Sequence, residues 1–283
     1  MNAPAQAAVE LPGDGLTLRA DAYGPPDGPP VLFFHGGGQS RRAWSGAARN
    51  IAAAGYRAYS VDLRGHGASD WAADGDYLLD AFGRDVEALL DSFDRPVALV
   101  GASRGGQSAL VGASRRPGKA ALVMLADVAP LLRDAGVDDF RDFFAASSAG
   151  FATIDEAADV LAAHLGLPRR SDVSGLAKTM RHGDDGRLYW QWDPLTVSPE
   201  FLNPPSEGLA LERAAARITD PVVLVRAEHS TIVTDEGEAL FRKLTPQLDV
   251  VLAKGVGHMV TGDRNDAFAE TLLDCLAHCS PVA

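Results

Sequence analysis

The chain has few cysteines and no long apolar run. Its two cysteines, Cys275 and Cys279, stand one helical turn apart, a spacing that suits neither a structural disulfide nor, without further ligands, a zinc site. No segment approaches the ~20 apolar residues that span a bilayer. The first ten residues also lack the basic start and apolar core of a signal peptide. We therefore expect a cytoplasmic protein with two thiols, no metal and no membrane contact.

Clustered positive charge is missing as well. The 283 residues include 38 acidic and 26 basic ones, for a net charge of −12. An acidic surface repels phosphate backbones, and no group of lysines and arginines offsets it. This composition excludes nucleic acid as an expected partner and leaves a small-molecule substrate as the expected one. It leaves the oligomeric state open, a homodimer included.

What the chain does have is an alternation of short apolar runs with amphipathic stretches, which predicts an α/β protein with a mostly parallel sheet covered on both faces. The first of the runs alternates apolar with polar residues and is expected at an antiparallel edge. The predicted strands are Leu16 to Tyr23, Val31 to His35, Arg57 to Leu63, Val97 to Ala102, Ala121 to Asp127, Val222 to Glu228 and Leu248 to Ala253. The predicted helices between them are Ala43 to Ala54, Leu78 to Phe93, Arg104 to Arg116, Glu236 to Leu244 and Asn265 to Ala277.

The alternation stops after Asp127 and resumes only at Val222, about ninety residues later, which is longer than a crossover needs. This segment carries helical patterns and no strand pattern. We interpret it as a helical cap over the carboxyl ends of the strands, where open α/β sheets bind ligands. The predicted division is residues 1–129 and 216–283 for the core and residues 130–215 for the cap.

Aromatic residues gather in the predicted cap, at Tyr189-Trp-Gln-Trp192 and between Phe140 and Phe144. Such residues are large enough to wall a pocket for an apolar or planar substrate, and they also commonly dock a cap onto a core. Trp190, Trp192 and Phe144 are accordingly the predicted substrate-binding residues of the cap, together with Gly36 of the core.

A serine stands between glycines in Val100-Gly-Ala-Ser-Arg-Gly-Gly106, where a predicted strand turns into a predicted helix. Alone, a G-x-S-x-G pattern also fits a small residue in a glycine-rich loop. At a strand-to-helix turn it predicts a nucleophile elbow, whose glycines permit the close approach of strand and helix. Ser103 is the predicted nucleophile.

A serine hydroxyl becomes a good nucleophile only when a base takes its proton. His258 follows the last predicted strand in a glycine-flanked loop and is the predicted base, with a structural histidine as the alternative. His66 also follows a strand, but its loop precedes the elbow and suits a structural turn.

A carbonyl under attack needs preorganised N–H donors. The loop His35-Gly-Gly-Gly38 follows a predicted strand, so the amides of Gly37 and Arg104 are the predicted oxyanion hole. The alternative for the glycine run is a flexible turn. The Arg104 side chain has two interpretations, a contact with a substrate carboxylate or a structural pair with a cap residue, and we favour the pair.

Four motifs in this order resemble the α/β-hydrolase superfamily, in the group that includes esterases, carbon–carbon hydrolases and cofactor-free haloperoxidases. They are His35-Gly-Gly-Gly38, Asp62-Leu-Arg-Gly-His-Gly-Ala-Ser69, Gly101-Ala-Ser-Arg-Gly105 and Gly257-His258. The resemblance implies an α/β-hydrolase fold with a mostly parallel eight-stranded sheet, a helical cap inserted after strand 6, no cofactor and a Ser-His-acid triad. Serine at position 103 argues against the aspartate-nucleophile members.

The acid departs from the commonest family pattern. Members usually carry it in the loop after the seventh strand, where this chain has Ser230 and Thr231. Some members place it at the end of the sixth strand, where this chain has Asp127. We therefore predict Asp127 as the acid, with Asp235 and Glu228 behind it, and keep open the alternative that Asp127 caps the next segment or bonds Ser230.

The leading functional hypothesis is a serine hydrolase that cleaves a small ester, lactone or amide through an acyl-enzyme on Ser103. The alternatives are a carbon–carbon hydrolase of a dicarbonyl-type substrate and a non-hydrolytic lyase or ligand receptor on the same scaffold. Fold resemblance does not choose the substrate.

Overall fold

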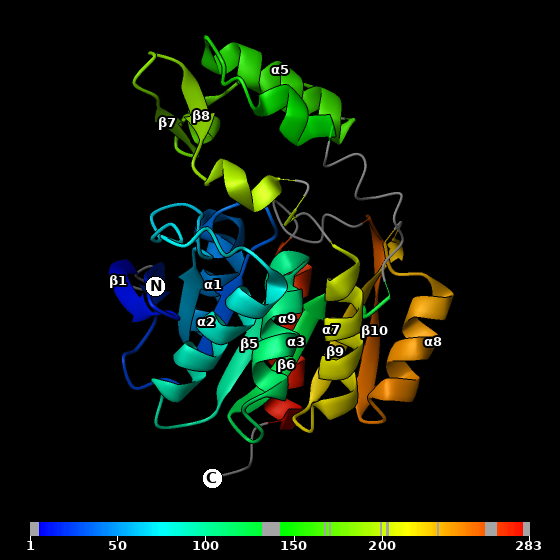
Figure 1. The fold of residues 1–283 in the computed structure, drawn as a ribbon. Coiled ribbons are helices and arrows are strands. Elements are labelled where there is room, and N and C mark those ends of the chain that lie inside the picture. Colours follow the sequence, from blue (N-terminus) through cyan, green and yellow to red (C-terminus); the bar gives the residue numbers. More distant parts are fainter. Residues whose placement is uncertain are drawn as a thin grey trace.

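The computed structural model describes residues 6–131, 142–166, 168–169, 171–198, 200–201, 204–230, 232–257 and 265–279 (Figure 1). The strands are β1 (Gln6–Pro12), β2 (Thr17–Tyr23), β3 (Pro30–Phe34), β4 (Arg57–Val61), β5 (Val97–Ala102), β6 (Ala120–Ala126), β7 (Met180–His182), β8 (Leu188–Trp190), β9 (Val222–His229) and β10 (Leu248–Gly257). The helices are α1 (Ser45–Ala53), α2 (Leu79–Asp91), α3 (Arg104–Ser114), α5 (Ile154–Leu165), α6 (Ser174–Ala177), α7 (Pro205–Arg217), α8 (Asp235–Leu244) and α9 (Asn265–Cys279), with a further helical stretch at 142–147. None of these helices is long and apolar enough to cross a membrane.

One eight-stranded sheet forms the centre of the molecule, in the order β1-β2-β4-β3-β5-β6-β9-β10. The strands β4, β3, β5, β6, β9 and β10 run parallel to one another, whereas β2 pairs antiparallel with both β1 and β4. This is the sheet that the resemblance implies, so the predicted fold class is confirmed. Because the parallel strands share one direction, their carboxyl ends meet at one edge of the sheet.

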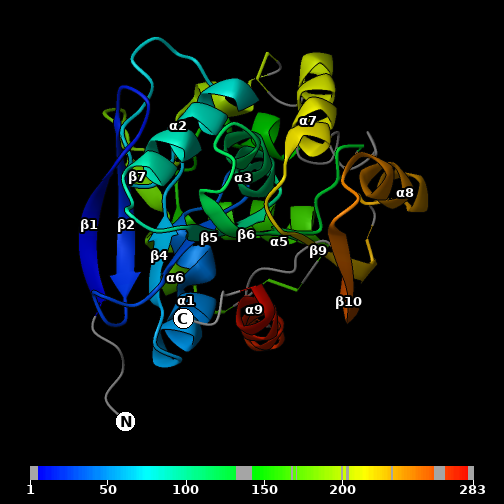
Figure 2. The same ribbon diagram turned by 90° about the horizontal axis from the view of Figure 1, so that it is seen from below.

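Helices cover both faces of the sheet, as Figure 2 shows, with α2, α3, α7 and α8 on one side and α1 and α9 on the other. The burial of strand β5 on both faces explains why its sequence is apolar throughout. Val97 and Leu99 enter the core under α2 and α3, whereas Ala98 and Val100 enter the core under α1 and α9. Successive side chains of a strand point to opposite faces, so a strand buried on both needs apolar residues at every position.

Three elements differ from the expectation. Strand β1 forms the edge of the sheet beside β2, so the run predicted at the edge lies one position inside it. The segment predicted to lack strands contains the short antiparallel pair β7 and β8. Helix α7 was not among the predicted helices. It begins at Pro205, within the proline-rich stretch that the sequence suggests is a break, because proline is favoured in the first turn of a helix.

The segment between β6 and β9, residues 127–221, is inserted between two strands that are neighbours in the sheet. We call it the inserted segment. Its part with α5, β7 and β8 lies beyond the carboxyl ends of the strands (Figure 1) and has its own apolar cluster around Phe151 and Trp190. Backbone hydrogen bonds attach it to the loop after β4, from Gly67 N–H to the Gln191 carbonyl (2.6 Å) and from Asp193 N–H to the Gly65 carbonyl (2.7 Å).

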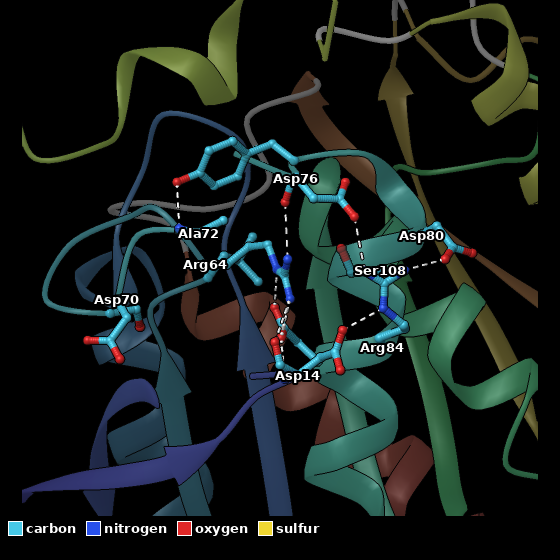
Figure 3. A network of polar contacts seen from close by, with 12 residues as sticks. Asp14, Arg64, Asp70, Ala72, Asp76, Asp80, Arg84 and Ser108 are labelled. Atoms are coloured by element: carbon cyan, nitrogen blue, oxygen red, sulfur yellow. Dashed lines mark hydrogen bonds and ion pairs between the residues drawn. The ribbon is translucent and has the colours of Figure 1, made fainter. Parts of the chain in front are cut away.

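A buried ion pair fixes the loop after β4 to helix α2. The Arg64 guanidinium donates from Nε and Nη2 to the two carboxylate oxygens of Asp85, at 2.7 and 2.8 Å. Arg64 also donates to the carbonyl of Asp76 (3.1 Å), and Arg84 of α2 bonds the carboxylates of Asp14, Asp76 and Asp80, so the network in Figure 3 joins three segments. Burial raises the pKa of Asp85, and Arg64 opposes that effect.

Replacing Asp85 by asparagine should lower the free energy of unfolding by about 3 kcal/mol or more, because Arg64 would stay buried without its counter-charge. Urea denaturation at neutral pH measures the change. Asp91→Asn is the matched control on the same helix: its pair with Arg116 is exposed, so the loss should stay below about 1 kcal/mol. Equal losses in the two variants would contradict this account of the buried pair.

Candidate active site

Ser103 occupies a strained turn between β5 and α3. Its backbone angles are φ 46° and ψ −124°, a region that side chains other than glycine rarely adopt. The flanking glycines are required by space: a Cβ on Gly101 would lie 2.5 Å from the Gly105 carbonyl carbon, and one on Gly105 would lie 2.4 Å from the Phe34 carbonyl oxygen. The turn has the strand–turn–helix context that a nucleophile elbow needs, with the Ser103 side chain partly exposed.

Asp127 stands at the equivalent place on the next strand. Ala102 of β5 pairs in register with Ala126 of β6, so Ser103 and Asp127 both follow directly on paired residues. Asp127 has a φ of 53°, and in the described part of the chain only it and Ser103 combine a side chain with a positive φ. Two adjacent strands thus end in strained residues that carry a hydroxyl and a carboxyl group.

The Asp127 carboxyl group is fully buried and held by donors from β9 and the loop after it. Ala227 N–H donates to Oδ1 (3.1 Å) and the Ser230 hydroxyl donates to Oδ2 (2.7 Å). The Ser230 oxygen in turn accepts from the amides of Ile232 (3.1 Å) and Val233 (2.8 Å). The bond to Ser230 that the sequence left as an alternative is therefore present, and it fixes the carboxyl group in one orientation.

The two other candidate acids lie in open surroundings. The Asp235 side chain is 90% exposed and pairs with Arg226 at 2.6 Å. The Glu228 side chain is 41% exposed at the end of β9. Exposed carboxylates gain little from an interaction with a nearby charge, whereas a buried, doubly hydrogen-bonded carboxyl group is suited to orienting a partner.

Two buried histidines hold the glycine loop after β3. His35 Nδ1 donates to the Gly36 carbonyl (2.7 Å), and its Nε2 accepts from Leu63 N–H (3.1 Å). His66 Nδ1 donates to the Arg64 carbonyl (2.9 Å), and its Nε2 accepts from Gly38 N–H (3.2 Å). Both rings therefore act as neutral Nδ1–H tautomers that join the loop after β3 to the loop after β4.

The burial of these rings determines their ionisation. Desolvation lowers the pKa of His35 to about 4 and that of His66 to about 3, and for His66 the neighbouring His35 lowers it further. The ring centroids are 5.1 Å apart, so a charge on one disfavours a charge on the other. His66 has the structural place that its sequence context predicts.

The glycine loop lies against Ser103. A Cβ on Gly36 would lie 3.4 Å from Ser103 Cβ. The amides on either side of Gly37 are engaged, Gly36 N–H with the Gln39 side chain (3.0 Å) and Gly38 N–H with His66. Gly37 is exposed between them. Its amide and that of Arg104, the first residue of α3, are the two donors of the predicted oxyanion hole, which stays a prediction.

The Arg104 side chain forms a structural pair. Its guanidinium donates to Glu207 Oε2 (2.7 Å) and to the Phe201 carbonyl (3.1 Å), and it lies 5.6 Å from the Phe82 ring centroid. The other Glu207 oxygen accepts from Leu79 N–H at the start of α2 (2.8 Å). Glu207 was not foreseen from the sequence. In the sequence, a glutamate in the first turn of a helix is already explained by its favourable interaction with the positive end of the helix dipole, so nothing marks it as the partner of Arg104.

The three predicted aromatic residues of the cap meet at one cavity. Phe144, Trp190 and Trp192 line a space of about 260 Å³. Trp190 and Trp192 stack with their centroids 5.3 Å apart and their planes at 12°. A Cβ on Gly38 would lie 3.1 Å from Phe144 Cε1 and 3.6 Å from Trp192 Cη2. The cavity therefore adjoins the glycine loop, and Phe144 and Trp192 stand between the two.

The predicted base, His258, lies outside the described residues. It follows Gly257, the last residue of β10, which pairs with His229 at the end of β9. Its role stays a prediction, as do the roles of the other site residues. Within the described ranges, no group of three or more histidine, cysteine, aspartate or glutamate residues is arranged to hold a metal ion.

Comparison with known proteins gives concordant results. A family model described as alpha/beta hydrolase fold matches residues 29–264. The esterase Rv0045c of Mycobacterium tuberculosis is 30% identical over 250 residues, which cover 86% of this chain and 80% of that protein.

Solved structures share the fold over almost the whole chain. E-2-(acetamidomethylene)succinate hydrolase superposes with a TM-score of 0.78 at 24% identity, over 97% of this chain and 98% of that one. A thioesterase domain from the curacin biosynthetic pathway has a TM-score of 0.75 at 24% identity, over 97% and 99% of the two chains. At this identity the likeness shows the fold alone.

Replacing Gly105 by alanine should lower the free energy of unfolding by about 3 kcal/mol or more, because the new methyl group would overlap backbone oxygens that cannot move aside. Thermal and urea denaturation measure the loss. Gly208→Ala, inside α7, is the matched control. It places a methyl group where no atom lies within 4 Å and should stabilise the protein by about 0.5–1 kcal/mol. A neutral Gly105→Ala would show that the strand and helix can separate.

The two buried histidines should make the protein less stable in mild acid. Their folded pKa values lie below the unfolded value near 6.5, so the unfolded state binds more protons from pH 6.5 down to about 4 for His35 and about 3 for His66. The free energy of unfolding should therefore fall by about 2 kcal/mol per histidine between pH 7.5 and pH 5.

Urea denaturation at these two pH values measures the slope. His66→Asn, which keeps a donor and an acceptor without titrating, should reduce it. His182→Gln, at an exposed position, should leave it unchanged. A slope that is the same in wild type and His66→Asn would contradict the assignment.

Proposed function

Because the chain belongs to the α/β-hydrolase family, as a hydrolase related to an esterase, we propose that it cleaves a small ester, lactone or amide through an acyl-enzyme on Ser103. In this proposal His258 is the general base and Asp127 is the acid that orients it. The amides of Gly37 and Arg104 form the oxyanion hole. No cofactor takes part.

The observation that carries the proposal is the strain at Ser103 and Asp127. Each such residue costs about 1–3 kcal/mol of stability, and residues of this kind gather at active sites. Here both stand at the carboxyl ends of neighbouring strands, at the edge where α/β folds bind ligands. A structural role alone gives no reason for a serine and an aspartate where glycine would relieve the strain.

The proposed acylation begins when Ser103 Oγ attacks the substrate carbonyl carbon while His258 takes the hydroxyl proton. The carbonyl oxygen becomes an oxyanion and accepts hydrogen bonds from the two amides. The bond to the leaving group then breaks, and the histidine gives its proton to the departing oxygen or nitrogen. The product of this half-reaction is an ester between Ser103 and the acyl group.

Deacylation repeats these steps with water. His258 takes a proton from a water molecule, whose oxygen attacks the acyl carbon and forms a second oxyanion in the same hole. Its collapse breaks the bond to Ser103 Oγ, which regains a proton from the histidine, and the carboxylic acid leaves. The net reaction consumes one water and regenerates the enzyme.

Asp127 acts in this scheme by holding the histidine in one tautomer and stabilising its charged form. The carboxyl group can do this only if its own position is fixed, which the donors from Ala227 and Ser230 achieve. Ser230 stands where most family members have their acid, and here its hydroxyl supports the acid on the neighbouring strand.

The inserted segment serves, in this proposal, as the cap that selects the substrate. Phe144, Trp190 and Trp192 would contact the acyl or leaving group beside the glycine loop, and Gly36 leaves room for it next to Ser103. The core and cap ranges predicted from the sequence, with the cap at 130–215, are part of the proposal.

Hydrolysis of p-nitrophenyl esters from acetate to hexanoate tests the triad. Ser103→Ala should abolish activity and labelling by a fluorophosphonate probe, and Asp127→Asn should lower kcat by about 10⁴-fold because the histidine loses its orienting partner. Asp235→Asn, which changes an exposed carboxylate of the same type, should stay within about twofold of wild type. Circular dichroism and the melting temperature confirm that each variant is folded.

Two results would oppose the proposal. Fluorophosphonate labelling that persists in Ser103→Ala would exclude Ser103 as the nucleophile. Full activity of Asp127→Asn, with a loss in Asp235→Asn or Glu228→Gln, would move the acid to the start of α8 or the end of β9.

A further inference from the structure

The cavity in the inserted segment contains polar atoms as well as rings. Its wall includes the residues Arg181, Trp190 and Ser198 together with Phe144, Tyr189 and Trp192. At about 260 Å³ it is slightly smaller than the ~300–1,000 Å³ of pockets that enclose a whole drug-sized ligand. It is therefore suited to one part of a substrate.

Three of these wall residues each carry a covered polar atom that has no hydrogen-bond partner among the described residues. The atoms are Nε of Arg181, Nε1 of Trp190 and Oγ of Ser198. Trp190 is only 7% exposed. A buried donor without an acceptor costs about 1–3 kcal/mol, and native structures hold few of them. All three belong to residues that line this one cavity, which is the basis for proposing an acceptor inside it.

Arg181 is positioned by aromatic rings. Its guanidinium carbon lies 5.4 Å from the Trp71 ring centroid and 5.0 Å from that of Tyr189. Contacts with ring faces hold the cation in place without using its N–H groups. Most other arginines near the core, such as Arg64 and Arg104, have a carboxylate partner. Arg181 has none among the described residues, so its N–H groups remain available to a ligand.

The donors define the ligand chemistry. A guanidinium and an indole supply N–H donors only, and a hydroxyl can join them as a third. A carboxylate has two acceptor oxygens and a negative charge, which matches this set better than a neutral carbonyl does. The surrounding rings favour an apolar or planar chain next to the charged end.

We propose that this cavity binds a carboxylate at the far end of the substrate's acyl group, with Arg181, Trp190 and Ser198 as its donors. The inference rests on the proposed function, because it places the scissile carbonyl at Ser103. The glycine loop lies next to both places: Gly36 is against Ser103, and Gly38 is against Phe144 and Trp192, whose rings the acyl chain would pass to reach the cavity. The preferred substrates are then half-esters of dicarboxylic acids.

A substrate series tests this preference. The mono-p-nitrophenyl esters of succinate, glutarate, adipate and suberate each have a neutral counterpart in which a methyl ester masks the free carboxylate. For the chain length that reaches the donors, wild-type kcat/KM for the free acid should exceed that of the masked ester by about 10-fold or more.

Arg181→Met keeps the length and apolar character of the side chain and removes the charge. It should lower kcat/KM for the free acid by about 10- to 100-fold and leave the masked ester within about threefold of wild type. Trp190→Phe should have a smaller effect in the same direction. Lys178→Met is the control, because it removes an exposed positive charge of the same segment that does not line the cavity.

Calorimetric titration with the free diacids separates this inference from the proposed function. If no ester is hydrolysed but a diacid binds wild type and not Arg181→Met, the carboxylate site stands and the esterase proposal fails. If the esters are hydrolysed with no preference for the free acid at any length, and no diacid binds, the inference is overturned.

Discussion

The contact between the first turn of α3 and the end of β3 determines the geometry of the candidate site. A Cβ on Gly105 would meet the carbonyl oxygens of Phe34 and His35 at 2.4 and 2.5 Å, so only glycine lets the helix start there. This approach brings the glycine loop after β3 beside Ser103. His35 then extends the same constraint to the loop after β4 through its bond to Leu63. The positions of Ser103 and of the loop amides are thus determined by backbone packing.

The sequence was sufficient to predict the core of the fold. Continuous apolar runs with helices between them identify parallel strands that are buried on both faces, and the order of the motifs identifies the family. The elements that it did not reveal depend on their partners. Strand β1 is largely exposed and forms by pairing with β2. Strands β7 and β8 have three residues each, too few for a periodic pattern. Helix α7 was not predicted because it begins at prolines, which in a sequence also indicate a break between elements.

In the candidate site, one local rule predicted a backbone feature that the structure contains. The G-x-S-x-G spacing at a strand end predicts the strained turn at Ser103, which the structure contains. Asp127 could be named only as the carboxylate at a strand end. Its bond to Ser230 joins residues about a hundred positions apart; the sequence offered that bond only as an alternative to the acid role, and the structure shows that it fixes the carboxyl group. Glu207 was missed because its value lies in joining Arg104 to Leu79.

The attachment of the inserted segment to the core uses backbone groups. Gly67 bonds Gln191, Asp193 bonds Gly65, and His66 forms a bridge with Trp192. Peptide groups are the same whatever side chains they carry, and the buried Asp193 carboxylate adds one side-chain bond, from the Tyr77 hydroxyl (2.7 Å). The backbone bonds at this seam therefore do not depend on which side chains line the cavity. Point substitutions can thus reshape the cavity while the backbone bonds between the inserted segment and the loop after β4 persist.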